Sequence, residues 1–283
     1  MTARRAAAAV ALVAGLVAGS LADRLPRRVP VRSGEYQILA GDFHVHAFPG
    51  DGSLTPLSLR DEASRAGLDV IAVTNHNQFV APRLIPWLPD DPDAPIVIPG
   101  EEVTDVEYHL IAVGIDQRIP TQTTIPEVVK AIHARGGVAI AAHPAGMFAG
   151  YDDWALATVD GTEVARADSR EQDRRDYVNV YERTRRTKPN LAAIGSSDMH
   201  TTLGLGDSRT YLFVRERSVS GVLEAVRSGR TVAVNDRGQM FGDPDLITII
   251  HRQVPAGRTD PHPWMRRMAA ALAWLGVAGL ALA

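Results

Sequence analysis

Five short apolar runs in this chain each end at a histidine, an aspartate or a glutamate, and this pattern constrains the fold more than any other feature. A short apolar run bounded by turn residues is typical of a buried parallel strand. Parallel strands that close into a barrel place their C-terminal ends on one face, where residues from distant parts of the sequence meet. The runs are residues 39–43 before His44 and His46, 69–73 before His76, 95–98 before Glu101 and Glu102, 137–142 before His143, and 191–195 before Asp198 and His200.

The residues at the ends of these runs predict a metal centre. His44 and His46 are two apart on one strand, so both side chains point to the same face and can bind one ion. Asp198 and His200 have the same spacing. Each motif alone has a plainer interpretation, such as a structural histidine or a turn aspartate, but their recurrence at successive strand ends favours a shared site. Imidazole and carboxylate together suit divalent Zn, Mn or Fe, so we expect a hydrolase with a multinuclear metal centre.

Composition narrows the function classes. The chain has 283 residues, and its middle part, about 230 residues long, suits a single barrel domain. The net charge of -3 gives no basic surface for nucleic acid, so we expect no nucleic-acid partner. The chain has no cysteine, which excludes disulfides, thiolate metal ligands and a thiol nucleophile.

Strand and helix signals alternate along the middle of the chain, which predicts an α/β fold with a parallel sheet. Thr55 and Pro56 are the start signals of one helix, and Gly67 is its stop signal. The polar stretch 151–188 shows only one element, a charged helix. The loops 78–95 and 145–190, which we expect to shape the pocket, carry no recognisable motif. The predicted helices are 56–66, 125–135, 170–186 and 219–228, and further strands are 108–115, 210–214 and 231–234.

Both ends of the chain are hydrophobic. Residues 1–23 are expected to be a signal peptide or an N-terminal membrane anchor, because a 17-residue apolar run follows two arginines and ends at small residues. Residues 264–283 are expected to be a C-terminal hydrophobic membrane helix. We therefore expect a membrane-associated protein, with membrane lipid as a partner. The domain would be extracytoplasmic, with the cytoplasmic face as the alternative. The part between is expected to be a linker at 24–35 and a metallohydrolase domain at 36–250.

The strand-end motifs resemble the successive motifs of the PHP family (polymerase and histidinol phosphatase domain), in the same order over residues 40–235. This resemblance implies a distorted (β/α)7 TIM-like barrel of PHP type, with a di- or trinuclear metal site, that hydrolyses phosphoesters. The motifs that carry it are His44-Val-His46, Asp51-Gly52, Thr74-Asn-His76, Pro99-Gly-Glu-Glu102, His109-Leu-Ile-Ala-Val-Gly-Ile, His143-Pro144 and Ser197-Asp-Met-His200.

The resemblance also implies a ligand set. One ion would be held by His44, His46, Glu102 and Asp198, a second by Asp51, His76 and His200, and a third by a bridging Glu102 with His109 and His143. The chain departs from the family pattern at one place, because Asn75 and Asn77 stand where aspartates are usual. If those aspartates support the ligands, the amides reduce the local negative charge at the second ion.

The function expected from this site is a metal-dependent phosphoesterase for a small phosphorylated substrate. A hydroxide bridging two metals would attack phosphorus, and His76 or His200 would protonate the leaving oxygen. Arg166, Arg170 and Arg209 are candidate clamps for substrate oxygens, with plain surface arginines as the alternative. Two other functions stay open. One is amide, carbamate or ester hydrolysis on the same fold, and the other is a membrane-tethered metal-binding module without turnover.

Overall fold

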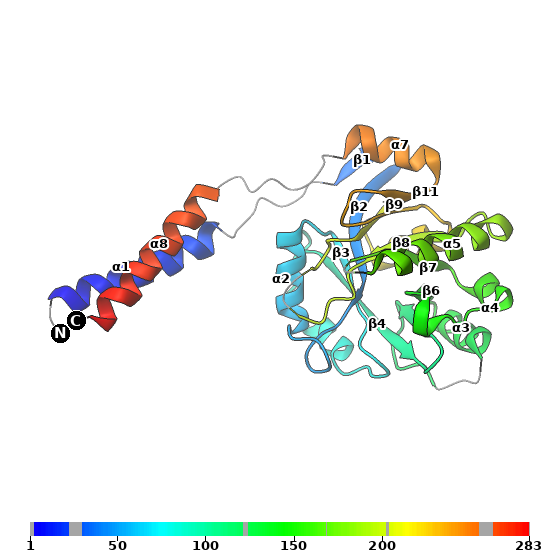
Figure 1. The fold of residues 1–283 in the computed structure, drawn as a ribbon, viewed down its shortest axis with the longest axis horizontal. Helices are drawn as coiled ribbons and strands as arrows, with labels where there is room; N and C mark the ends of the chain where they lie inside the picture. Colours follow the sequence, from blue (N-terminus) through cyan, green and yellow to red (C-terminus); the bar gives the residue numbers. More distant parts are fainter. Residues whose placement is uncertain are drawn as a thin grey trace. The chain divides into compact units, whose positions relative to one another are not determined.

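Our computed structural model describes residues 3–22, 30–120, 124–167, 169–201, 204–254 and 263–282 (Figure 1). The chain divides into two compact units, one formed by Met1–Arg27 with Gly257–Ala283 and the other by Arg28–Ala256. The second unit holds the sheet. Its strands are β1 (Val31–Ser33), β2 (Tyr36–Val45), β3 (Val70–Val73), β4 (Ile96–Thr104), β5 (His109–Val113), β6 (Val138–Ala142), β7 (Gly161–Arg166), β8 (Ala192–Ser196), β9 (Arg209–Val214), β10 (Thr231–Val234) and β11 (Met240–Gly242).

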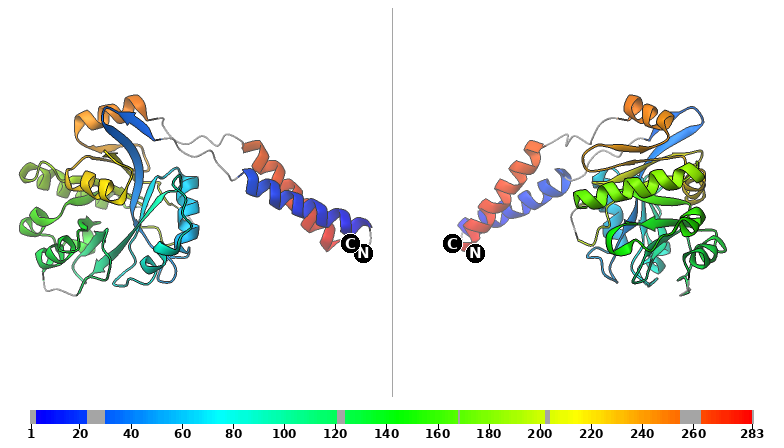
Figure 2. Two further views of the ribbon diagram at one scale, coloured as in Figure 1. Left: turned by 180° about the vertical axis from the view of Figure 1, so that it is seen from behind. Right: turned by 45° about the vertical axis from the view of Figure 1, so that its right-hand side comes forward.

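Helices lie around the outside of this sheet (Figures 1 and 2). Most of the helix signals in the sequence are confirmed. The helix predicted at 56–66 is α2, where Thr55 Oγ1 accepts a hydrogen bond from Ser58 N and Gly67 ends the helix with a φ of 73°. The helices of this unit are α2 (Pro56–Ala66), α3 (Ile125–His133), α4 (Asp153–Thr158), α5 (Glu171–Thr187), α6 (Val219–Arg227) and α7 (Pro244–Gln253), with short 3-10 helices η1 (Pro82–Trp87) and η2 (Gly146–Phe148).

The sheet is mixed, so the prediction of a parallel sheet is wrong for part of it. The strand order is β11-β10-β9-β2-β3-β4-β5-β6-β7-β8, with β1 paired to β2. β2, β3 and β4 are parallel, and so are β6, β7 and β8, whereas β5 is antiparallel to both of its neighbours. β4 and β5 are joined by residues 105–108 alone, and a parallel pair needs a crossover of a dozen residues or more.

The sheet curves into a nearly closed barrel. The barrel closes where β8 approaches β9. There the side chain of Thr210, in place of backbone-to-backbone pairing, makes the hydrogen bonds to the neighbouring strand. Thr210 Oγ1 accepts a hydrogen bond from Gly195 N and donates one to Gly195 O, both at 2.9 Å. A Cβ on Gly195 would lie 2.4 Å from Arg209 O, so only glycine permits this approach.

An apolar core supports the barrel below the polar strand ends. Aliphatic side chains from most of the strands are completely buried and pack with the inner face of α6. Such close packing fixes the strand ends relative to one another, which a multi-residue site requires. The core includes Leu39, Val70, Ile98, Ile111, Ile140, Ile194, Leu212, Val222 and Val226.

The stretch 151–188 holds two elements that the sequence analysis missed. α4 and β7 both precede the charged helix, which is α5. β7 has the sequence Gly-Thr-Glu-Val-Ala-Arg, and its first five residues are buried. A strand with polar side chains on a buried face does not show the apolar run that was used to find the other strands.

The terminal unit is a pair of helices, α1 (Ala3–Ala22) and α8 (Pro263–Ala281). Glycines let the two backbones approach closely, since a Cβ on Gly15 would lie 2.5 Å from Ala273 N. No helix among the described residues has the length and apolar character that a membrane span requires. This finding corrects the prediction of membrane helices at the two ends and of a membrane-associated location, and it gives the expected membrane-lipid partner no support. Residues 23–29, which include the first half of the expected linker, lie outside the described residues.

Candidate metal centre

The nine residues predicted as metal ligands lie together at one end of the barrel, where each contacts at least one of the others. Most of them stand at or just after the C-terminal ends of parallel strands, as the alternation of strands and helices requires. His109 is the exception, because it is the first residue of β5. β5 runs opposite to β4 and β6, so its first residue lies at the same end as their last ones. The nine are His44, His46, Asp51, His76, Glu102, His109, His143, Asp198 and His200.

The first group of ligand atoms is buried and comes from β2, β4 and the segment after β8. His44 Nε2 lies 3.1 Å from both Glu102 Oε2 and Asp198 Oδ1. His46 Nε2 lies 3.4 and 3.2 Å from the same two oxygens. None of these four atoms has a hydrogen-bond partner among the described residues. Ligand atoms around a tetrahedral zinc with bonds of about 2.0–2.2 Å are about 3.3–3.6 Å apart, so the four positions fit one ion.

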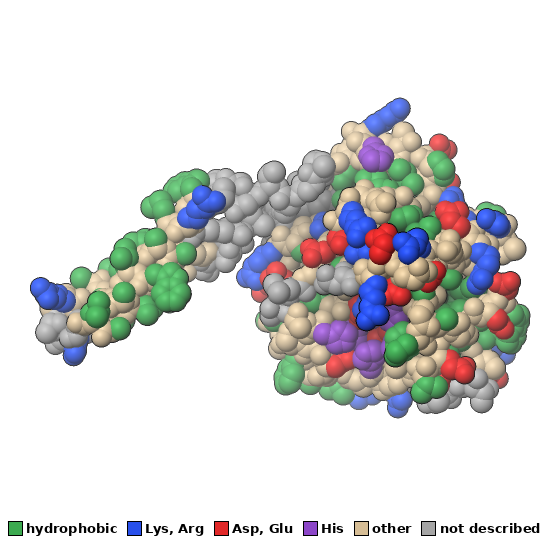
Figure 3. Space-filling view, in the orientation of Figure 1, with side chains coloured by type: hydrophobic (Ala, Val, Ile, Leu, Met, Phe, Trp, Pro, Cys, Tyr) green, Lys and Arg blue, Asp and Glu red, His purple; other side chains and the backbone are tan. Residues whose placement is uncertain are grey.

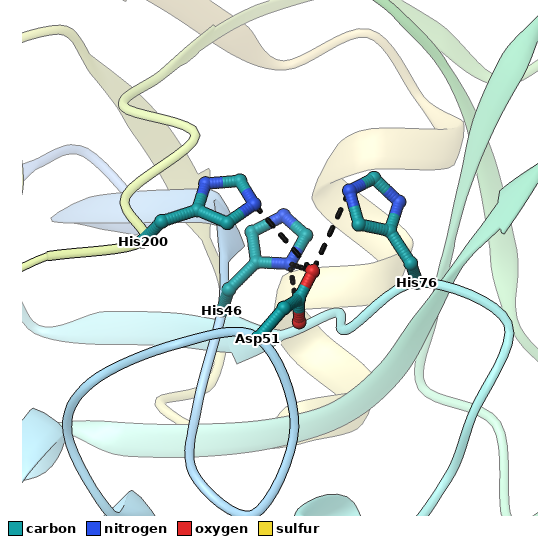
Figure 4. A group of neighbouring side chains, drawn as sticks. All are labelled: His46, Asp51, His76 and His200. Atoms are coloured by element: carbon teal, nitrogen blue, oxygen red, sulfur yellow. Dashed lines mark hydrogen bonds and ion pairs between the residues drawn. The ribbon is translucent and has the colours of Figure 1, made fainter.

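The second group is more open and is drawn in Figure 4. It consists of His46, Asp51, His76 and His200, whose ligand atoms lie within 4.8 Å of one another. Asp51 Oδ2 is 3.2 Å from His46 Nδ1 and 3.5 Å from Nε2 of both His76 and His200. The sequence analysis expects Asp51, His76 and His200 in this group, and the structure adds His46, which contacts both groups.

The third group surrounds the other oxygen of Glu102. Oε1 lies 2.8 Å from His109 Nδ1 and 3.3 Å from His143 Nε2. The atoms that lie close enough to share an ion are those of His76, Glu102 and His109. His143 thus contacts the same oxygen of Glu102 as His109, whereas His76 Nδ1 lies 2.9 Å from Oε2. The ligand roles themselves stay a prediction.

The charges of these groups are strongly coupled. Burial alone would raise the pKa of Glu102, but the charge of His44 and hydrogen bonds from His109 and His143 hold it well below its usual range. The pKa of Asp198 is lowered in the same way, against burial, by His44 and His46. Both carboxyl groups are thus ionised near neutral pH, which is the form that binds a cation.

Glu163 on β7 belongs to the site although the sequence analysis missed it. Its side chain is completely buried, and Oε1 accepts hydrogen bonds from His44 Nδ1 at 2.9 Å and from Ser196 Oγ. Oε2 accepts one from the backbone N of His143 at 2.6 Å. A carboxylate bound to the second nitrogen of a ligating histidine orients the ring and raises its basicity. In the sequence, Glu163 is only one polar residue of the stretch 151–188, ahead of the charged helix predicted at 170–186.

Asp42 is a second residue that the sequence analysis missed, two positions before His44. Its carboxylate accepts hydrogen bonds from the backbone N of His44, Ser197 and Gly206 at 3.1–3.3 Å. Burial raises its pKa to about 6. Asp42 thereby ties β2 to the segment that carries Asp198. The alternation Asp-x-His-x-His on one strand face was the signal that could have found it.

The departure at Asn75 and Asn77 has a structural reason. Asn75 Nδ2 donates to Ala47 O at 2.6 Å and to Asp51 Oδ1 at 3.1 Å, which an aspartate could not do. Asn77 has a φ of 45° and exchanges two hydrogen bonds with the backbone of Thr104. Asparagine is among the residues that tolerate this left-handed conformation best. Asn75 therefore supports the loop that carries Asp51.

A cavity of about 360 Å³ opens beside the third group. Its apolar wall includes Phe148, whose ring centre lies 3.9 Å from that of His109. Arg166 and Arg170 also line the cavity, and Arg166 Nη2 donates to Asp198 Oδ2. Arg209 does not line this cavity, since it donates to the backbone oxygens of Gly206 and Ala66. Two of the three candidate arginine clamps thus lie where a substrate could reach them.

Comparisons with known proteins agree with this geometry. No family model matches the chain. An uncharacterized protein of Methanocaldococcus jannaschii is 27% identical over 117 residues, which cover 38% of this chain and 68% of that protein. A crystal structure from Bacteroides vulgatus, of a two-domain protein containing a predicted PHP-like metal-dependent phosphoesterase, matches with a TM-score of 0.60 and 24% identity. The match covers 81% of this chain and 74% of that chain.

The chain has the PHP fold. The lesion-specific endonuclease EndoQ of Pyrococcus furiosus also matches, with a TM-score of 0.52 and 12% identity, over 83% of this chain and 71% of that one. At these levels of identity the likeness concerns the fold. The PHP resemblance expected from the strand-end motifs is therefore confirmed as a likeness of architecture, and the chemistry of the site is argued from its own residues.

Proposed function

We propose that this PHP protein is a metal-dependent phosphoesterase that acts on a small phosphorylated substrate. The observation that carries the proposal is the set of four buried ligand atoms on His44, His46, Glu102 and Asp198. They have no hydrogen-bond partner within the described part of the chain and are spaced to fit one ion. Buried polar atoms without a hydrogen bond are costly, and a cation bound between these four would remove that cost. Histidine and carboxylate ligands together suit Zn, Mn or Fe.

Two or three divalent ions, when bound, would polarise the phosphoryl oxygens and lower the pKa of a coordinated water. Glu102 would hold ions on both of its oxygens, since each oxygen lies beside different imidazoles. Asp51, near three histidines, would complete the more open group. Glu163 and Asp42 would keep His44 and Asp198 in place.

His76 and His200 are the candidates for protonating the leaving oxygen. Their side chains are 35% and 37% exposed, whereas those of His44 and His46 are completely buried. The Nδ1 of His200 lies 3.0 Å from Asp198 O, where it can donate, so only Nε2 is left for the reaction. Nε2 can protonate a leaving oxygen only when it binds no ion, so the acid is whichever of the two imidazoles the second group leaves free of metal. A general acid must reach the reacting oxygen, and these two imidazoles can.

The full chain, loaded with Mn or Zn, tests the proposal on p-nitrophenyl phosphate and bis(p-nitrophenyl) phosphate, with and without chelator. We expect hydrolysis of at least one of them that the chelator abolishes, and the preferred compound distinguishes monoester from diester chemistry. Hydrolysis of p-nitrophenyl acetate or a carbamate alone would replace the phosphoesterase by a carbonyl hydrolase. Bound metal without any turnover would leave a metal-binding module.

A further inference from the structure

A second cavity, of about 340 Å³, lies between the start of α5 and the β10–β11 hairpin. Its apolar lining residues include Val164, Val178 and Phe241, and most of the others are arginine and amide side chains, with Glu171 as the one carboxylate. Arg166 lines both this cavity and the one beside the metal centre, so the two adjoin. Figure 3 shows basic side chains, mixed with acidic ones, beside the exposed histidines on one face of the molecule.

We propose that this second cavity, here called the arginine cavity, binds a second anionic group of the substrate. The substrate class is then a small molecule with two separated anionic groups, one of them the phosphoester at the metal centre and the other a phosphate or carboxylate. This inference rests on the proposed function, because the metal centre must hold the first group.

Two arginines of the cavity are available to an incoming anion. Arg237 Nη1 lies 2.8 Å from Glu171 Oε2, and Arg175 Nη1 lies 3.7 Å from Oε1 of the same carboxylate. One glutamate thus faces two guanidinium groups, and all three side chains are more than half exposed. Exposed ion pairs contribute little to stability, so a phosphate can displace the Glu171 carboxylate. The phosphate would then accept bidentate hydrogen bonds from the two guanidinium groups.

The frame around these arginines is fixed by more buried contacts. Arg174 makes a bidentate pair with Asp236, at 2.6 and 3.0 Å, and donates through Nε to Ser169 O at 2.9 Å. Asn235 Oδ1 accepts hydrogen bonds from the backbone N of Arg237 and Gln239. The loop after β10 is therefore held against the start of α5. A preorganised site loses less conformational entropy when it binds a ligand.

The remaining wall favours a small molecule over a nucleic-acid strand. Asn179 and Gln239 add neutral amide donors, and the apolar side can hold a carbon skeleton between two anionic groups. A strand needs a continuous basic track along the surface, and the chain has a net charge of -3.

Binding of phosphonates to the metal-loaded full chain tests the inference by calorimetry, without relying on turnover. The probes are alkane-α,ω-bisphosphonates of increasing length and the matching alkyl monophosphonates. We expect one chain length at which the bisphosphonate binds about 10- to 100-fold tighter than the monophosphonate. Arg175→Gln and Arg237→Gln should remove most of this advantage. Arg183→Gln is the matched control, because Arg183 is on the same helix, pairs with Asp153 and lines neither cavity.

Equal affinity for the two kinds of phosphonate at every length would overturn the inference. So would an advantage that survives both arginine variants, or one that Arg183→Gln reduces equally. A chain that binds metal but no monophosphonate would reject the phosphoester site itself, which is the proposed function. Tighter, salt-dependent binding of a short single-stranded oligonucleotide, lost in the same two variants, would replace the small molecule by a strand.

Discussion

Glu102 is completely buried and lies within ion-pair distance of five imidazoles. Of the two adjacent glutamates at this strand end, Glu101 points elsewhere and accepts a hydrogen bond from Ile119 N at 2.7 Å. Neighbouring residues on a strand face opposite sides, so one of the two had to be excluded from the centre. The geometry of the metal centre thus depends on the side chains that surround the ligands as much as on the ligands themselves.

Glu163 gives the first prediction at this scale. Replacing Glu163 with Gln keeps the shape of the side chain but removes the charge that faces His44 Nδ1 at 2.9 Å. We expect metal affinity to fall by about 10- to 100-fold with the fold retained, because the orienting partner of a ligand is weakened. Competition with a chromogenic chelator measures the affinity, and circular dichroism measures the fold. Glu182→Gln, on the exposed side of α5, is the control, and an equal effect in both variants would contradict the role of Glu163.

Asn75 gives a prediction about stability. Asn75→Asp would place a carboxylate oxygen against Ala47 O and Asp51, where the amide now donates at 2.6 and 3.1 Å. We expect the free energy of unfolding to fall by about 1–3 kcal/mol, the cost of leaving a buried acceptor unpaired. Urea denaturation measures it. Asn190→Asp is the control, because the hydrogen bond from Asn190 to Arg227 O is exposed, and it should lower the free energy of unfolding clearly less. Equal losses at both positions would contradict the supporting role of Asn75.

At the scale of elements, Asp42 joins β2 to the segment that follows β8. Asp42→Asn replaces one of two acceptor oxygens by an amide nitrogen, so the hydrogen bond from Ser197 N or Gly206 N is lost. We expect a loss of about 1–3 kcal/mol in stability and a weaker metal affinity, because this segment carries Asp198 and His200. Protection of the Ser197 and Gly206 amides from hydrogen exchange should fall as well. Unchanged protection at both amides would show that Asp42 does not hold the segment.

The terminal helices allow a test by disulfide trapping. A Cβ built on Gly19 lies 3.7 Å from Ala269 Cβ, close to the usual Cβ separation of about 3.8 Å in disulfides. The chain has no cysteine, so Gly19→Cys with Ala269→Cys should form one intramolecular disulfide on mild oxidation. A shift in mobility on non-reducing electrophoresis detects it. Gly19→Cys with Leu275→Cys is the control, since Leu275 is 66% exposed, and cross-linking in the control alone would contradict the helix pairing.

Sequence reasoning worked for elements whose signals are local. Caps such as Thr55 and Gly67 and the apolar runs before His76 and His143 predicted α2, β3 and β6, because these signals depend on neighbouring residues only. It failed for β7, whose buried face is polar, and for the direction of β5, which is set by the short turn at 105–108 and by pairing with distant strands. Hydropathy at the chain ends also suggested membrane helices that the described helices do not provide.

At the scale of the whole molecule, the barrel turns weak sequence signals into one site. Residues separated by more than 150 positions, such as His44 and Asp198, lie 3.1 Å apart because β2 and β8 end on the same face. The strand-end motifs predicted which residues would meet, while their grouping depends on side-chain positions that the sequence does not contain. His46 contacts two groups, and His76 lies beside Oε2 of Glu102 while His109 and His143 lie beside Oε1.

If these residues hold divalent metal, the purified protein must bind it in a fixed ratio, and its metal content can be measured. The full chain is loaded with Mn or Zn, freed of unbound ions, and analysed by inductively coupled plasma mass spectrometry. We expect two or three ions per chain, and a loss of at least one ion in Glu102→Gln with the fold retained. Less than one ion per chain, or the same content in Glu102→Gln, would contradict it.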